Sequence, residues 1–157
     1  MLNSLPVAIQ NLFLVGFGLI LGSFANVVIH RLPLGQSVVR PRSRCPGCKK
    51  EIFWFDNVPV LSWILLRGRC RACKIKISIR YPVVELMVAA LFLAAKIQFG
   101  WSPLLWIRDF PVLFSFVVIT FIDLDHRIIP NEFSLGGSLY LLAMAFLLPD
   151  GLRFDAV

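Results

Sequence analysis

Acidic residues are scarce in this chain of 157 residues: nine Asp and Glu stand against sixteen Lys and Arg, which gives a net charge of +7. Charged residues of both signs make up only 16% of the sequence, and no low-complexity tract or internal repeat is present. A chain of this length with 58% hydrophobic residues has more apolar surface than one water-soluble core can bury. The composition therefore excludes an ordinary soluble domain and indicates a membrane protein, in agreement with a mean hydropathy of +0.79.

Cysteine is also rare, and its four positions form a pattern. Cys45 and Cys48 make one C-x-x-C pair, and Cys70 and Cys73 make a second pair after 21 intervening residues. Each pair places two thiolates on one tight turn, so that four of them complete a tetrahedron around zinc. The alternative is two disulfides, which require an oxidising compartment. The spacing predicts a zinc site, provided that this segment lies in the cytosol.

The positive charge is concentrated in the segment that contains the cysteines. Twelve of the sixteen Lys and Arg residues lie between Arg31 and Arg80, where Glu51 and Asp56 are the only acids. The segment thus carries +10, whereas the rest of the chain sums to −3. Long apolar runs flank it on both sides, and a basic loop between two spans is expected on the cytoplasmic face. We do not expect nucleic acid as a partner, because a ribbon tethered to a membrane at both ends is poorly suited to it.

We predict an all-α integral membrane protein with about four spans of ~20 residues each. The first apolar run lacks the basic start and the cleavage site of a signal peptide, so it is expected to be a retained helix. Glycines at 16, 18 and 22 and at 136 and 137 are expected to allow close helix packing. Both termini are then expected outside. The predicted divisions are a first span over 1–30, a basic zinc-binding loop over 31–80, three spans over 81–148, and a short polar tail over 149–157. Residues 100–103 and 108–109 are expected to form a short outer loop before a third span over about 110–124.

An aromatic and apolar insert separates the two cysteine pairs. It contains Phe53, Trp54, Phe55 and Trp63, but Asp56 and a proline interrupt it, and it is too short to be a span. Two arrangements are open: the insert packs on the small metal core, or it lies at the membrane interface, where Trp is favoured.

Polar side chains inside the spans are candidates for a functional site, because they are costly in lipid. Asn26 lies near the inner end of the first span, where packing or an interhelical hydrogen bond is the alternative to a direct role. Glu85 lies about one turn inside the second span. A salt bridge to Arg80 or to another loop cation is the alternative explanation for Glu85.

Asp123 ends a mostly apolar run at the inner edge of the third span. Desolvation there would favour the protonated carboxyl that a general acid needs, although an ordinary helix-end carboxylate is equally compatible with the position. Asp125 is expected to be more solvated, and residues two apart do not share a helix face, so Asp123 and Asp125 are not expected to form a catalytic pair. Pro130 and Asn131 are expected to supply the turn and the cap before a fourth span.

Several motifs occur together in a characteristic order. They are GSFANVVIHRLP over 22–33, which includes Arg31, the two cysteine pairs, RYPVVE over 80–85, and Asp123 followed seven residues later by Pro130 and Asn131. With these motifs the sequence resembles the bacterial prepilin leader peptidases, membrane aspartic proteases that also N-methylate the new N-terminus. The resemblance covers residues from about 12 to 140.

The resemblance implies eight spans in the bacterial inner membrane and a cytosolic tetracysteine loop that holds zinc. It also implies cleavage of type IV prepilin or pseudopilin leaders at the cytosolic edge, with S-adenosylmethionine as methyl donor. The first catalytic aspartate of the family falls on Asp123. The second lies in a Gly-x-Gly-Asp motif, which this sequence lacks, and no glycine-rich methyltransferase signature is visible. The remaining acids Asp150 and Asp155 are expected on the opposite side of the membrane.

Two functions therefore stay open at this point. The chain would be the N-terminal part of a prepilin peptidase, active with a complementing C-terminal half, or a methyltransferase in its own right. Alternatively, it would be a zinc-binding membrane protein that binds pilin leaders or a secretion-system partner without cutting them. An Asp123–Glu85 pair is the one way in which this part could cut alone.

Overall fold

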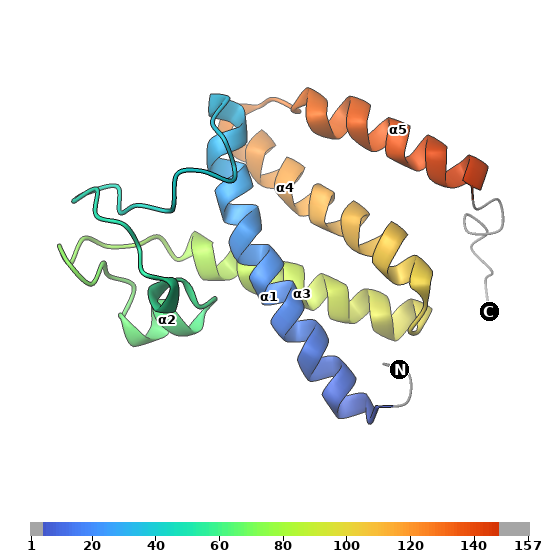
Figure 1. The fold of residues 1–157 in the computed structure, drawn as a ribbon, viewed down its shortest axis with the longest axis horizontal. Coiled ribbons are helices and arrows are strands. Elements are labelled where there is room, and N and C mark those ends of the chain that lie inside the picture. The colour runs from blue at the N-terminus through green and yellow to red at the C-terminus, as the bar shows by residue number, and fades with distance from the viewer. Residues whose placement is uncertain (1–4, 148–157) are drawn as a thin grey trace.

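The computed structural model describes residues 5–147, so the predicted tail over 149–157 and its acids Asp150 and Asp155 lie outside the described residues. The described chain is helical, as predicted, with two isolated β-bridges in the loop and no extended strand. Its main helices are α1(Val7–Arg31), α3(Arg80–Phe99), α4(Phe110–His126) and α5(Asn131–Leu147), and a short α2(Leu61–Leu65) lies in the loop between α1 and α3 (Figure 1).

Among the described residues, three helical segments are long and apolar enough to cross a bilayer, namely Val7–Leu34, Arg80–Phe99 and Leu105–His126. The third is longer than predicted, because a π-helical turn, η4(Leu105–Asp109), replaces the outer loop that was expected around Arg108 and continues into α4. Helix α5 has 17 residues, the lower limit for a spanning helix. A fourth span therefore remains a prediction.

Helices α1 and α3 run antiparallel and make the closest helix pair of the fold. A Cβ atom at Gly18 would lie 2.6 Å from the Cα of Ala89, and one at Gly22 would lie 2.5 Å from the Cα of Glu85. Only glycine permits this approach, which is the packing predicted for the small-residue face. Gly16, in contrast, meets no atom within 4 Å, so only part of that face is used.

The buried core lies where α1, α3 and α4 meet. Phe92 of α3 stacks on Phe110 of α4 with ring centroids 4.1 Å apart, and Trp106 joins this aromatic group from η4. Near the same end of the pair, the Lys96 ammonium donates to Asn11 Oδ1 at 2.9 Å. These contacts fix the ends of the spans opposite the cysteine loop.

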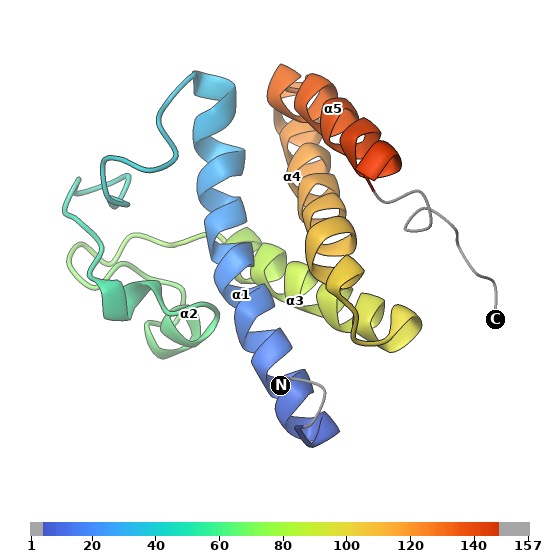
Figure 2. The same cartoon turned by 45° about the vertical axis from the view of Figure 1, so that its right-hand side comes forward.

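Helix α5 is attached loosely. None of its residues is buried, and a Cβ atom at Gly136 or Gly137 would meet nothing within 4 Å. The close packing predicted at these glycines is thus not made with the described residues. Figure 2 shows α5 folding back beside α4 after the turn at Pro130, with its other faces open.

Candidate functional site

The two cysteine pairs are built on nearly identical backbone turns. The Cys45 N–H donates to the Lys50 carbonyl and the Lys49 N–H donates back to the Cys45 carbonyl, at 3.0 and 2.9 Å. Cys70 repeats this pattern with Ile75 and Lys74, at 2.9 and 3.0 Å. Lys49 and Lys74 both adopt φ of 59°, and a β-bridge closes each turn, Arg44 with Glu51 and Arg69 with Lys76. Each half of the site is therefore formed by local hydrogen bonds.

The turns bring all four sulfurs together. The Sγ atoms of Cys45, Cys48, Cys70 and Cys73 lie within 4.8 Å of one another, and those of Cys45 and Cys73 are 3.7 Å apart. An ion with Zn–S bonds of about 2.3 Å places its sulfurs roughly 3.8 Å apart in a tetrahedron. All four residues are free thiols, and an S–S bond would be about 2.05 Å long. The donor set and its spacing fit one tetrahedral metal ion rather than two disulfides.

The pKa values of the neighbouring cysteine thiols depend on one another. A hydrogen bond from the Cys48 backbone lowers the pKa of Cys45 to about 6. The largest influence on Cys73 is a backbone hydrogen bond from Ile75, which lowers its pKa, but desolvation and the three neighbouring sulfurs raise it to about 11. Four thiolates at this spacing repel one another, so a cation at their centre removes the repulsion that keeps the last of them protonated.

The aromatic insert is anchored to the second cysteine turn. The Asp56 carboxylate accepts three hydrogen bonds from the Arg71 guanidinium, the shortest at 2.6 Å. The Trp63 indole N–H donates to the Ile77 carbonyl at 3.2 Å, and its ring covers Gly68, where φ is +63°. The insert thus packs in part on the metal core. Asp56 is the only acid in the insert, and this indicates that it pairs with a cation of the basic loop. The pair with Arg71 was not predicted from the sequence.

Glu85 connects the insert to the spans. Its side chain is buried, and Oε2 accepts the Val60 backbone N–H at 2.7 Å. Val60 has φ of 58° and ψ of −51° at the centre of a turn in which the Leu61 N–H donates to the Pro59 carbonyl, an unfavourable conformation for a β-branched residue. The salt bridge to Arg80, the alternative explanation for Glu85, is not formed, because Arg80 pairs with Asp125. Glu85 instead holds a backbone N–H at the wall of a cavity of about 420 Å³ between the loop and α3.

Asn26 and Arg31 have structural contacts near the inner end of α1. The Asn26 amide donates to the Tyr81 carbonyl at 3.1 Å and to the Gly22 carbonyl at 3.2 Å, so it makes the interhelical hydrogen bond that was one of its two interpretations. Arg31 donates to the Ser37 carbonyl at 3.0 Å and closes the turn that follows the helix.

Arg80 binds the end of α4. Its guanidinium pairs with Asp125 at 2.7 Å, donates to the Phe121 carbonyl at 3.1 Å, and lies 4.8 Å from the centroid of the Phe121 ring. Asp125 is therefore paired rather than simply solvated. The contacts lie on either side of Asp123 in sequence and hold the last turn of α4 against the start of α3.

Asp123 itself is exposed, and its carboxylate has no hydrogen-bond or ion-pair partner among residues 5–147. Its backbone carbonyl accepts the Arg127 N–H at 2.8 Å, where the helix ends in a left-handed residue. Pro130 supplies the first accepting carbonyl of α5, and Asn131 is the first residue of that helix rather than its cap. The proposed pairing with Glu85 is not formed, because Glu85 is bound to Val60.

Comparison with known proteins decides the family. A family model described as the bacterial peptidase A24 N-terminal domain matches residues 16–99, which include both cysteine pairs and Glu85. The chain belongs to this family. The matched range ends before Asp123, so the model does not bear on the role of that residue.

Curated relatives carry the names that the motifs suggested. The chain is 49% identical over 134 residues to a prepilin leader peptidase/N-methyltransferase of Myxococcus xanthus, which covers 85% of this chain and 40% of the relative. It is 41% identical over 150 residues to a type 4 prepilin-like proteins leader peptide-processing enzyme of Escherichia coli, covering 83% and 55%. The chain thus spans about half the length of the curated relatives it matches. No solved structure matches significantly.

Proposed function

We propose that this chain contributes Asp123 as one of two catalytic carboxylates of a prepilin leader peptidase. The observation that carries the proposal is an exposed aspartate without a partner, at a helix end held by Arg80, in a chain of the A24 family. The names of the relatives and the resemblance of the motifs support the activity. The substrates on this proposal are type IV prepilins or pseudopilins.

The chemistry requires a second acid. In an aspartic protease one carboxylate acts as base toward water while the other protonates the carbonyl of the scissile bond. Asp125 is bound to Arg80 and Glu85 to the Val60 N–H, so neither is placed to share a proton with Asp123. We propose that the second carboxylate comes from a complementing C-terminal half, in keeping with the Gly-x-Gly-Asp motif that the family resemblance implies.

The four cysteines hold a structural zinc ion on this proposal. A bound ion would supply folding free energy to a loop that has little apolar core. The chain's own residues then transmit the order of the loop to the spans: Asp56 and Trp63 fix the insert on the second cysteine turn, and Val60 reaches Glu85.

The proposed location is the bacterial inner membrane, with both termini outside and the zinc loop in the cytosol. The excess of Lys and Arg between residues 31 and 80 supports this orientation. A cysteine introduced at the exposed Gln36 is expected to react with a membrane-impermeant thiol reagent only after the cytosolic side is opened. Labelling in intact cells would reverse the orientation.

N-methylation of the new N-terminus, with S-adenosylmethionine as donor, belongs to the same proposal. It is supported by the N-methyltransferase in the names of the relatives. The cleaved N-terminus would emerge at the same end of the spans as Asp123, so both reactions would use one location.

The second candidate function is a zinc-binding membrane protein that binds pilin leaders or a secretion-system partner without cutting them. It is favoured by the cluster of four sulfurs within 4.8 Å of one another, which needs no catalytic carboxylate. On this view Asp123 is only a helix-end residue, and its replacement by Asn leaves binding and any processing by other enzymes unchanged.

A processing assay in membranes separates the two functions. The chain is co-expressed with a complementing segment that carries a Gly-x-Gly-Asp motif, and cleavage of a prepilin is followed for wild type, Asp123→Asn, Asp125→Asn and Glu85→Gln. We expect Asp123→Asn to abolish cleavage and Asp125→Asn to reduce it only partly. Full activity of Asp123→Asn in the complemented membranes would refute the catalytic role.

A further inference from the structure

A hollow of about 460 Å³ at the C-terminal end of α2 gathers positive charge. Its lining consists of Leu65, Leu66, Arg67, Arg69 and Lys74. Three of these five residues are cations and none is acidic. Within residues 5–147, none of the three cations makes an ion pair or a side-chain hydrogen bond. Two guanidinium groups and an ammonium around one concavity favour an anion with several acceptor oxygens, such as a phosphate group.

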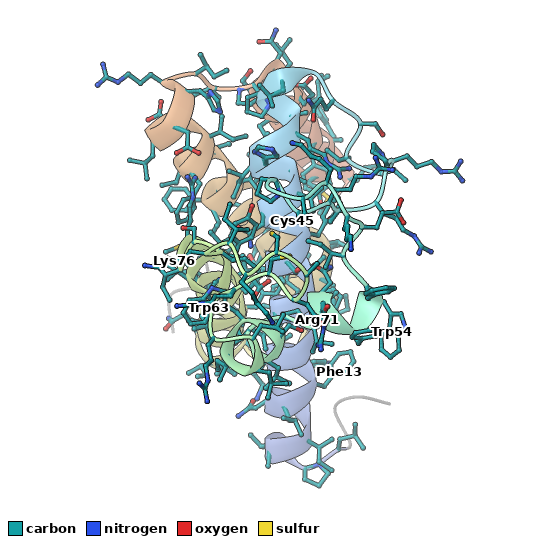
Figure 3. All side chains as sticks on the ribbon, turned by 90° about the vertical axis from the view of Figure 1, so that its left-hand side faces the viewer. Phe13, Cys45, Trp54, Trp63, Arg71 and Lys76 are labelled. Atoms are coloured by element: carbon teal, nitrogen blue, oxygen red, sulfur yellow. The ribbon has the colours of Figure 1, made fainter. Side chains whose placement is uncertain are left out.

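The surface beside this hollow is strongly apolar. Leu65 lines the hollow and is 81% exposed, and Trp54, in the separate turn η3(Trp54–Asn57) that precedes α2, is 82% exposed. Leu61 and Ile64 of α2 are exposed as well. In Figure 3 the Trp54 side chain points away from the body of the protein. Exposed aliphatic and Trp side chains next to cations are the combination that lies at a membrane interface.

Two observations place this surface beside the spans. The Val60 N–H, one residue before α2, binds the carboxylate of Glu85, which lies five residues inside α3. Figures 1 and 2 both show α2 near the end of α3 at which that helix begins, the end expected on the same side of the membrane as Arg31. A segment held at this level of the spanning helices meets lipid before it meets bulk water.

We propose that the hollow binds the headgroup phosphate of an anionic phospholipid in the leaflet at the Arg31 end of the spans. The apolar side chains of α2 and Trp54 lie among the neighbouring acyl chains. The zinc loop is then held by Glu85 on one side and by lipid on the other. A nucleic acid fits the hollow less well, because the exposed leucines beside it have no role in such a complex.

The test is tryptophan quenching by brominated lipid in the purified, zinc-loaded chain in nonionic detergent. Brominated phosphatidylglycerol and brominated phosphatidylcholine are added at the same mole fraction. We expect phosphatidylglycerol to quench more, and this excess to shrink at high ionic strength because salt screens the cations. Trp54→Phe should remove most of the excess, because Trp54 lies on the proposed lipid-facing surface.

A matched pair of variants tests the hollow itself. The triple variant Arg67→Gln, Arg69→Gln, Lys74→Gln should lose the excess quenching. The control triple variant Arg40→Gln, Arg42→Gln, Lys49→Gln removes the same charge from exposed loop positions outside the hollow, and it should keep the excess. Each variant changes one lysine with φ of 59°, Lys74 or Lys49, and the hollow variant also changes Arg67, where φ is 52°. Retention of one zinc equivalent in both shows that the loop is folded.

Three results would overturn the proposal. Equal quenching by the two lipids would show that the surface has no preference for anionic headgroups. Equal loss in both triple variants would show an effect of net charge rather than a site. Abolition of the excess by inorganic phosphate, at the concentration of the added lipid, would show that the hollow takes free anions instead of lipid.

Discussion

The cysteine loop contains all four residues of a candidate metal site, whereas the C-terminal end of α4 contains one residue of a candidate catalytic pair. In the loop, four sulfurs from two turns lie within 4.8 Å of one another, and every turn is closed by its own hydrogen bonds. At the end of α4, Asp123 is exposed and without a partner among the described residues, although Arg80 holds the helix turn around it. The first region brings together all four candidate metal ligands, and the second offers, on the proposal above, one of two catalytic carboxylates.

The difference follows from how far apart in the sequence the residues of each site lie. Metal ligands in two C-x-x-C turns are placed by hydrogen bonds to residues four and five positions away, so the segment 45–75 contains both the ligands and the turns that hold them. A carboxylate pair in a membrane protease needs two helices that face each other at the same depth, and that depends on packing between distant segments. Removing one contact at a time should therefore affect the two regions very differently.

The largest effect is expected when the metal ligands are removed. The double variant Cys45→Ser, Cys70→Ser takes one ligand from each turn, and structural zinc sites contribute on the order of 10–16 kcal/mol to folding. We expect loss of the zinc equivalent and rapid proteolysis within 45–77, while α1, α3 and α4 stay helical. Metal analysis and limited proteolysis measure both effects. A loop that stays resistant without metal would show that the insert is stable by its own packing.

A moderate effect is expected at the contact between α1 and α3. Gly22→Ala places a methyl group 2.5 Å from the Cα of Glu85, so the helices must separate, at a cost of about 1–3 kcal/mol. Gly16→Ala is the control, because nothing lies within 4 Å of that position. Thermal unfolding in detergent should show a lower midpoint for Gly22→Ala alone. Equal midpoints for the two variants would mean that the close approach is not needed for stability.

The smallest effect is expected at the Arg80–Asp125 ion pair. The two side chains are 34% and 36% exposed, so the coupling between them should be about 0.2–1 kcal/mol. A double-mutant cycle of Arg80→Gln and Asp125→Asn, followed by thermal unfolding, isolates this term. Processing by complemented membranes should fall more for Arg80→Gln than for Asp125→Asn, since only Arg80 also binds the Phe121 carbonyl. Equal losses would limit the role of Arg80 to its charge.

Local pattern accounted for much of the fold and of the metal site. Apolar runs located the spans, and the cysteine spacing predicted the cluster, because both depend on residues that are close in sequence. Element boundaries moved where local chemistry allowed more helix: α3 begins at Arg80, before Pro82, since proline lacks only an N–H that is free in the first turn. The segment around Arg108 is helical although it resembled a loop.

Long-range partners were the part that the sequence did not predict. A salt bridge to Arg80 was one of two explanations for Glu85, which lies five residues further along the same helix, but Arg80 reaches Asp125, 45 residues away, on α4. Glu85 binds a backbone N–H in an unfavourable turn at Val60, for which the sequence contains no signal. Such contacts depend on how helices cross and on where a metal-bound loop folds back.

The most direct measurement of the central claim is prepilin cleavage by residues 1–157 alone. Membranes that contain the wild-type chain, with its zinc site intact, are incubated with a prepilin and compared with membranes that also contain the complementing segment. The proposal of a zinc site complete in this chain and of only one catalytic carboxylate predicts full zinc content in both samples and cleavage only in the complemented one. Cleavage by the wild-type chain unaided, lost in Asp123→Asn, would show that a second carboxylate from outside is not required.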